Sequence, residues 1–342
     1  ENALQTWTSN YFTLGFNTDM PDSMVKRFVE ASLPYVFSKH QVDSIFLISF
    51  WDPLVMLLIL VLIFLTVLLL DWAISKWRKK QSLEVKIIAR IKVMALNFLV
   101  SQLYGVYGDF VFYAILGLRS THQTAGMNLL NLFFIIILWA AMLLGFFLHL
   151  NLLKRYQNLK KSFRGNVETK QHFDRFIEDN AGIQVLFDDF KDQTLAQQSF
   201  LFVLTIRDIL FSIILTTLFD HPLTECILIL LMNIATIAYL FIKKPFKEMV
   251  VQVQQVVLEL ITMVVNISVL ILAAFDANHS EAFDQRKTIG KFLIITNMVF
   301  NFTVVGFMLL LLFLQGWGIY KYYKAKRLRI KPSRSISSLE NM

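Results

Sequence analysis

Residues 53–74 read PLVMLLILVLIFLTVLLLDWAI, a run in which Asp71 is the one charged residue. As an α-helix, a run of this length extends about 33 Å, enough to cross the hydrocarbon core of a bilayer, which is about 30 Å thick. Within that core the backbone must satisfy its own hydrogen bonds, so only helices and closed barrels can span it. The run lacks the alternation of a barrel strand and therefore predicts a transmembrane helix.

Six further apolar runs follow along the chain, which is the pattern of a multi-span protein. They cover about residues 93–117, 127–151, 199–219, 223–242, 250–275 and 288–320. The second run is the most interrupted, by Gln102, Gly105, Gly108 and Asp109. The last run is longer than a span needs, so we expect it to tilt or to project beyond the bilayer. The expected fold class is all-α, a polytopic transmembrane helical bundle of about seven spans.

The composition of the chain supports a membrane protein. Hydrophobic residues make up 56% of the 342 residues, and the mean hydropathy is +0.56; an ordinary soluble domain has about 45–50% apolar residues. The single Cys226 excludes a disulfide framework within the chain. The net charge of +8 comes from basic residues beside the apolar runs. This position favours anionic lipids on the cytosolic side as partners and argues against nucleic acid.

The charges of the connections predict the orientation of the chain. The connections after the first, third and fifth runs and the segment after the last run are rich in Lys and Arg, whereas those after the second and fourth runs are poor in them. Because basic connections stay in the cytosol, we expect the N-terminus outside and the C-terminus in the cytosol. Asn278-His279-Ser280 is a glycosylation acceptor sequence in an expected outer connection, with Asn278 as the acceptor.

Two segments are expected to flank or interrupt the bundle formed by residues 44–320. Residues 1–43 form an extracellular pre-membrane segment, in which Pro21-Asp22-Ser23 favours the start of a short helix. We expect this helix to pack over the outer ends of the spans. Residues 154–198 form the largest cytosolic loop, with two short amphipathic helices separated near Asn180-Ala181-Gly182.

A basic segment, residues 321–342, ends the chain as a cytosolic tail. Polybasic stretches just inside a span attract anionic lipid, and phosphorylation of the serines that follow would weaken that attraction. The alternative is a disordered tail whose basic residues only set the topology. The expected lipid-facing residues are Lys321, Lys324, Lys326, Arg327, Arg329 and Lys331.

Strongly polar residues stand inside the apolar runs at similar counted depths. Gln102, Arg207, Asn233 and Glu259 each lie roughly 12–14 Å above the inner boundary, counting 1.5 Å per residue. An unpaired charge there would cost several kcal/mol, so we expect Arg207 to pair with Glu259 and the two amides to complete the hydrogen bonds. Asp208 is a rival partner, set aside because successive helix residues do not face each other. The cluster either clamps the helix packing or forms a gating or ion-coordinating site.

Motifs of enzymatic chemistry are not found in the sequence. It contains no phosphate-binding glycine loop, no nucleophile elbow and no metal spacing of His and Cys. Asp188, Asp189 and Asp192 lack the glycine turn and the terminal Glu of an EF-hand loop, so we expect a solvated acidic face there. No enzyme, metal or cofactor is expected.

Residues 199–260 resemble a known membrane domain. Arg207, the short turn Asp220-His221-Pro222, Asn233, Lys244-Pro245-Phe246-Lys247 and Glu259 stand as in the TRP-like domain of fungal and ciliate multi-span proteins, a family related to polycystins. The stretch Lys86 to Gln102 is similar to the same domain. In ciliates such domains often follow Cys-rich furin-like repeats, which would fit a chain that starts at Glu1 within a longer protein. The resemblance implies a channel-like or sensory module in a plasma or ciliary membrane.

Function hypotheses of three kinds follow from these observations. The first is a non-enzymatic TRP-like module that anchors or transduces from an extracellular or membrane assembly, with other membrane or extracellular proteins as partners. The second is a cation channel subunit, although the short connection between the last two runs lacks a filter-like segment. The third is a seven-span receptor. Two features argue against a receptor: the third run ends without an acidic residue before Arg155, and the seventh run ends without an Asn-Pro pair.

Overall fold

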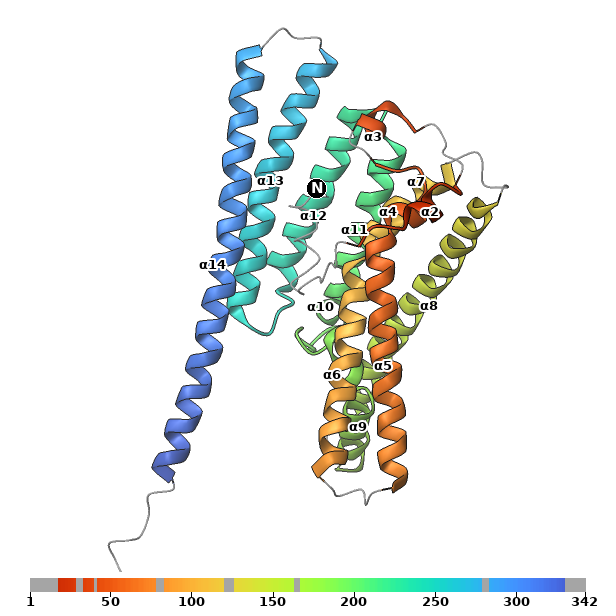
Figure 1. Ribbon diagram of the computed structural model, residues 1–342. Helices are drawn as coiled ribbons and strands as arrows, with labels where there is room; N and C mark the ends of the chain where they lie inside the picture. The colour runs from red at the N-terminus through yellow and green to blue at the C-terminus, as the bar shows by residue number, and fades with distance from the viewer. Residues whose placement is uncertain are drawn as a thin grey trace, which may run out of the picture.

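The computed structural model describes residues 18–28, 33–39, 42–77, 83–119, 126–162, 167–278 and 283–329. These residues form helices and no strand, so the expected all-α fold class is confirmed (Figure 1). The helices are α2 (Asp22–Val25), α3 (Tyr35–Lys39), α4 (Phe46–Ser49), α5 (Trp51–Trp77), α6 (Leu83–Gly105), α7 (Tyr107–Arg119), α8 (Met127–Ser162), α9 (Val167–Asp179), the 3-10 helix η1 (Ala181–Leu186), α10 (Leu195–Gln198), α11 (Phe200–Thr217), α12 (Pro222–Lys243), α13 (Met249–Ala277) and α14 (Phe283–Arg329).

Six of the described helices, α5, α8, α11, α12, α13 and α14, are long and apolar enough to cross a membrane. The expected span at 93–117 is instead divided between α6 and α7, which meet at Val106. α6 ends at Gly105, a residue type that weakens helices because it lacks a side chain. The N–H groups of Val106 and Phe110 still donate to the carbonyls of Gln102 and Val106, at 3.2 and 2.9 Å. Hydrogen bonding therefore continues across the break, although no single helix spans the segment.

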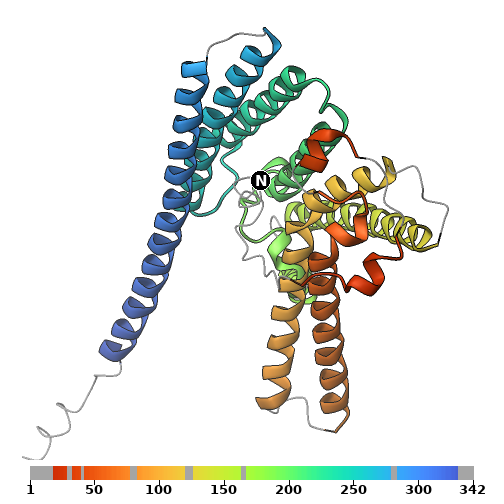
Figure 2. The same ribbon diagram turned by 45° about the horizontal axis from the view of Figure 1, so that its top comes forward.

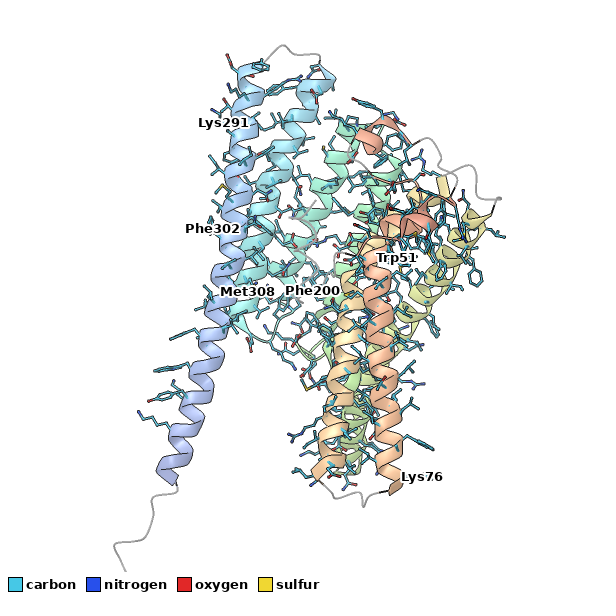
Figure 3. The ribbon with its side chains drawn as sticks, viewed as in Figure 1. Trp51, Lys76, Phe200, Lys291, Phe302 and Met308 are labelled. Carbon is cyan, nitrogen blue, oxygen red and sulfur yellow. The ribbon has the colours of Figure 1, made fainter. Side chains whose placement is uncertain are left out.

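The long helices form two antiparallel pairs with further helices between them. Figures 1 and 2 show α13 and α14 on one side of the molecule and α5 and α6 on the other. α12 packs against α13, and α11 packs against α7. In Figure 3, Trp51 at the start of α5 lies near the level of Phe200 at the start of α11. The sequence predicts that Trp51 marks an outer helix end and Phe200 an inner one, yet the two residues lie near the same level. Depths counted in residues from the helix ends therefore cannot be compared between helices.

α14 is longer than the apolar run that predicted it. Its 47 residues extend about 70 Å at 1.5 Å per residue, more than twice the hydrocarbon core. The helix continues to Arg329, so the first part of the expected tail is helical. Lys321 and Lys324 are exposed on it. Of the other predicted lipid-facing residues, Lys326, Arg327 and Arg329 lie on α14 with side chains outside the description, and Lys331 lies outside the described residues.

The turn between α12 and α13 is determined by local sequence. Pro222 begins α12, where its missing N–H is not needed. Lys244 ends that helix in the left-handed region with φ of 46°, and Pro245 follows it. The turn is held by the loop before α10: Phe190 and Phe246 form an isolated β-bridge, and the Lys191 N–H donates to the Pro245 carbonyl at 2.6 Å.

The segment after α8 packs against α6 through one asparagine. The Asn97 Nδ2 donates to the carbonyl of Ala181 at 2.8 Å, and the Val185 N–H donates to Asn97 Oδ1 at 3.1 Å. α9 and η1 are separated at Asn180, as the sequence predicted. The ring of Phe173 on α9 packs edge-on against Tyr156 of α8, with centroids 5.2 Å apart.

The described part of the pre-membrane segment lies over the helix ends and is tied to them. The N–H and Oγ1 of Thr18 both donate to Asp52 Oδ1, at 3.1 and 3.0 Å. The Leu47 N–H donates to Asn131 Oδ1 of α8 at 2.9 Å. α2 begins after Pro21, where the sequence predicted a helix start.

Candidate functional site

Arg207 of α11 and Glu259 of α13 form an ion pair. Nη1 of Arg207 lies 2.6 Å from Oε1 of Glu259. The Glu259 side chain is fully buried and that of Arg207 is 14% exposed. Burial limits how far water can compensate the two charges, so each depends on its partner. The pair therefore links two helices that are separated in sequence by all of α12.

Two amides complete the hydrogen bonds of the Glu259 carboxylate. Asn233 Nδ2 on α12 donates to Glu259 Oε2 at 2.7 Å, and Gln255 Nε2 donates to Oε1 at 3.3 Å. The structure thus brings together three of the four predicted cluster residues and adds Gln255. The signal for Gln255 was present in the sequence, because residues four apart face each other on a helix.

Asp208 is a second partner of Arg207, which corrects the sequence interpretation that set it aside. Asp208 Oδ1 lies 3.0 Å from Nη2 and 3.3 Å from Nε of Arg207. The argument from successive helix positions failed because the Arg side chain is long enough to turn its guanidinium toward the adjacent residue. Arg207 is therefore shared by two carboxylates, one on its own helix and one on α13.

Gln102 lies apart from this cluster, contrary to the expectation. Its side chain is buried on α6, but the hydrogen bonds of Glu259 go to Arg207, Asn233 and Gln255. The lateral position of its helix explains this: α6 packs mainly against α5 and η1, and α7 takes the place beside α11. The polar residue of the divided segment that faces the cluster is Asp109 on α7. In the sequence Asp109 counted only as an interruption of the run.

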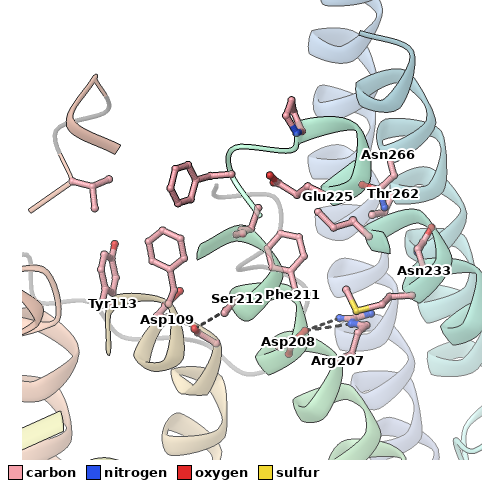
Figure 4. Close-up of a pocket in the computed structure, with 18 of the residues that line it drawn as sticks. Asp109, Tyr113, Arg207, Asp208, Phe211, Ser212, Glu225, Asn233, Thr262 and Asn266 are labelled. Carbon is pink, nitrogen blue, oxygen red and sulfur yellow. Dashed lines mark hydrogen bonds and ion pairs between the residues drawn. The ribbon is translucent and has the colours of Figure 1, made fainter. Parts of the chain in front are cut away.

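A cavity of about 940 Å³ lies beside the ion pair, between α7, α11, α12 and α13 (Figure 4). Arg207, Asp208, Asn233 and Glu259 lie on its wall. Its other described lining residues are Val36, Phe37, Val42, Gly105, Gly108, Asp109, Phe112, Tyr113, Phe211, Ser212, Leu215, Phe219, Pro222, Glu225, Ile229, Met232, Thr262 and Asn266. The cluster therefore lies on the wall of a hollow.

Side-chain contacts hold α7 against α11 and so form one wall of this cavity. Ser212 Oγ on α11 donates to the Gly108 carbonyl on α7 at 2.8 Å. Arg119 Nη1 at the end of α7 donates to the Thr216 carbonyl at 2.6 Å. A Cβ added at Gly108 would lie 3.6 Å from Asp208 Cβ, so the two helices are in van der Waals contact there.

Aromatic rings close the end of the cavity nearest the pre-membrane segment. Phe37 on α3 packs edge-on against Phe112 of α7 and against Phe219 after α11, with centroid separations of 6.1 and 5.4 Å. The Arg119 guanidinium lies over the Phe219 ring, 4.8 Å from its centroid. α3 thus covers the cavity, which gives a defined role to a segment expected only to pack over the spans.

Two acidic residues between η1 and α10 are paired with lysines. Asp188 lies 2.6 Å from Lys247, and Asp192 lies 2.6 Å from Lys160. Partial burial raises the pKa of Asp192, but hydrogen bonds from Lys160 and Tyr156 outweigh it, so the pKa lies below its usual value. Among the described residues no group of His, Cys, Asp or Glu is arranged to hold a metal ion.

Asn278, the predicted glycosylation acceptor, is exposed and directly follows α13. His279 and Ser280, the rest of its acceptor sequence, lie outside the described residues.

Comparisons with family models, curated proteins and solved structures returned no match to this chain. The class of the protein rests on the molecule itself. An all-α chain with six long apolar helices in its described part is a multi-span integral membrane protein. Its most distinctive site is a charged cluster inside the bundle, beside a large cavity.

Proposed function

We propose that this chain is a non-enzymatic, TRP-like membrane module that transduces a signal from the outer side to the cytosolic side. The observation that carries the proposal is the Arg207–Glu259 pair on the wall of the cavity. Ionisable side chains are expensive inside a bilayer and usually mark a functional site. Here Arg207 and Glu259 link α11 to the α13–α14 pair.

The cluster supports transduction because Arg207 has two anionic partners on different helices. Nη2 and Nε of its guanidinium face Asp208 on α11, and Nη1 faces Glu259 on α13. A stimulus that strengthens the contact with Asp208 would weaken the hold on α13. Such a choice between two contacts is the kind of two-state element that coupling between sites requires.

A path to the cytosolic segment begins where α13 begins. The turn before α13 bonds to the loop before α10, with the Lys247 N–H donating to the Asp189 carbonyl at 3.1 Å. That loop is joined to α8 by the Asp192–Lys160 pair. Movement of α13 would therefore be transmitted to the loop and to the end of α8.

A cation channel subunit is the alternative function. α13 ends at Ala277 and α14 begins at Phe283, so residues 278–282 are too few for a re-entrant filter segment between the last two helices. This connection favours the transducer. The proposed setting is a plasma or ciliary membrane, with anionic lipids and other membrane or extracellular proteins as partners and with no nucleic acid.

The position of α14 relative to α5 tests the proposal. Spin labels would be placed at Leu62→Cys and Met298→Cys, both 54% exposed in the native protein, in a Cys226→Ser background in nanodiscs. We expect a single distance distribution for this protein and a second population after Glu259→Gln. Thr262→Val, one turn along α13, is the matched control and should keep the single distribution. An unchanged distribution in Glu259→Gln would mean that the pair is only a packing clamp.

The number of subunits distinguishes the channel. Native mass spectrometry of the nanodisc complex should give a monomer or a dimer, too few subunits to surround a shared central pore, if the chain is a transducer. A tetramer would favour the channel and would call for conductance recordings with Glu259→Gln.

A further inference from the structure

The lining of the cavity is strongly acidic. Asp109, Asp208, Glu225 and Glu259 contribute four carboxylates, whereas Arg207 is the one cationic side chain among the described lining residues. With all of these groups ionised, the formal charge of the wall is −3. Arg207 is already engaged by Asp208 and Glu259. The cavity therefore has the electrostatic character of a site for a cation.

Glu225 is the carboxylate most available to a ligand. It lies in the first turn of α12 and is partly exposed, and its carboxylate has no hydrogen bond or ion pair with any described residue. In Figure 4, Glu225 of α12 and Phe211 of α11 extend into the same space. A carboxylate held in a hollow between helices without a partner is poorly solvated, and a bound cation would compensate it.

A second polar group on the wall also lacks its partner. The Asn233 residue is only 5% exposed, and its Nδ2 is used by Glu259. Its Oδ1 is buried and has no donor among the described residues. Buried acceptors normally have a donor; without one, this oxygen adds its partial negative charge to the acidic wall.

The remaining wall is aromatic and apolar, which decides the kind of cation. Phe112, Tyr113, Phe211 and Phe219 line the same cavity. Aromatic faces attract organic ammonium groups, and cages of such rings recognise them in proteins. The volume of about 940 Å³ falls in the range of about 300–1,000 Å³ for small-molecule sites. It far exceeds the space that a bare metal ion needs, and no metal-holding group occurs among the described residues.

We infer that this cavity binds an amphipathic organic cation, with its ammonium group against the acidic wall and its apolar part against the aromatic wall. The inference rests on the proposed function, for which it supplies the stimulus. A bound ammonium group competes with Arg207 for Asp208. Arg207 then interacts with Glu259 alone, which strengthens the contact between α11 and α13. The same ammonium chemistry occurs in free amines and in the headgroup of phosphatidylcholine.

Binding of radiolabelled phenyltrimethylammonium, measured by equilibrium dialysis with the full chain in dodecylmaltoside, tests the inference. We expect saturable binding that tert-butylbenzene, the uncharged isostere, does not displace. Glu225→Gln should weaken binding about tenfold or more, the loss of one well-placed contact. Asp220→Asn removes the same charge from the exposed turn outside the cavity and should leave binding unchanged. Phe211→Leu should weaken binding by a smaller factor.

Several results would overturn the inference. These are equal binding by Glu225→Gln and the native chain, equal displacement by the uncharged isostere, and stoichiometric displacement by sodium or calcium ions. Competition by added phosphatidylcholine would support the ammonium site and identify a lipid headgroup as the source, and its absence would support a free amine. The isostere comparison uses the native chain, so it remains decisive even if a variant does not fold.

The spin-label measurement separates this inference from the proposed function. A second distance population in Glu259→Gln without any binding of the probe would overturn the ligand and leave transduction standing. Binding of the probe while Glu259→Gln changes nothing would support the site and contradict the transducer.

Discussion

Arg207 on α11 and Glu259 on α13 meet at 2.6 Å on the wall of a cavity between the helices, and Asp208 holds the other side of the same guanidinium at 3.0 Å. Glu259 is fully buried, whereas Asp208 keeps 16% of its side chain exposed. Arg207 is thus the one residue whose loss would leave two carboxylates without their cation. The first predictions follow from this asymmetry.

Replacement of Arg207 by Leu should cost more stability than replacement of Glu259 by Gln. Arg207→Leu leaves a buried charge uncompensated, which typically costs about 3–5 kcal/mol. Glu259→Gln leaves Arg207 paired with Asp208 and keeps an amide that Asn233 and Gln255 can bond, so a loss of about 1–3 kcal/mol is expected. The free energy of unfolding in bicelles gives both values. The double variant should lose less than the sum of the two, and strict additivity would contradict a direct pair.

Asp208→Asn should cost little alone and much in combination with Glu259→Gln. Each carboxylate can replace the other as the partner of Arg207, so only the double variant leaves the guanidinium unpaired. We expect an excess loss of about 1–3 kcal/mol over the sum of the single losses, within the range seen for residues in one network. The unfolding measurement gives this excess loss. The control is the double variant in which Asp220→Asn, instead of Asp208→Asn, is combined with Glu259→Gln. If the stability loss of the double variant does not exceed the sum of the single losses, Asp208 does not share the cation.

Gly182→Ala should loosen the contact between η1 and α6. A Cβ at Gly182 would lie 2.7 Å from Leu96 Cδ2, closer than atoms normally approach. Overpacking of this kind costs about 1–3 kcal/mol. Limited proteolysis within residues 154–198 should be faster in the variant. Leu96→Ala in the same chain removes the atom that clashes and should restore part of the resistance, whereas Gly306→Ala on α14, where nothing lies within 4 Å, should have no effect.

The Asp192–Lys160 contact should stabilise the segment of residues 154–198 at neutral pH and lose this effect in acid. The pKa of Asp192 is lower in the folded protein than its ordinary value, because bonds from Lys160 and Tyr156 outweigh the opposing effect of partial burial. A lowered pKa gives stability that is present above the unfolded-state pKa, about 3.9, and is lost as the pH falls through the folded-state pKa.

The native chain should therefore be more stable than Asp192→Asn at pH 7, by about 1 kcal/mol or less because both side chains are about a third exposed. The difference should shrink as the pH falls and should vanish once the pH lies below both the unfolded-state and the folded-state pKa. Thermal unfolding of the two proteins across pH gives the comparison. Asp188→Asn, whose pair with Lys247 is about half exposed, should show a smaller difference, and a difference for Asp192 that grew in acid would contradict the assignment.

The sequence alone determined the membrane class and most helices, because length and apolar composition are local properties that satisfy the backbone within each helix. The runs at 53–74 and 250–275 became α5 and α13 with only a few added residues. It also determined that Arg207, Asn233 and Glu259 needed polar partners, since a charge in hydrocarbon cannot stay alone. Gly105 and Asp109 indicated a break near Val106 in the sequence. They did not indicate how the two resulting helices would pack.

Only the tertiary structure decided which polar residues meet. Depth counted along separate helices carries no information on lateral neighbours, so Gln102 was grouped with a cluster that it does not join, and Asp109 was left out of the cavity that it lines. The role of Asp208 depended on the direction of one long side chain. The cavity itself arises from the spacing of α7, α11, α12 and α13, which no single helix encodes.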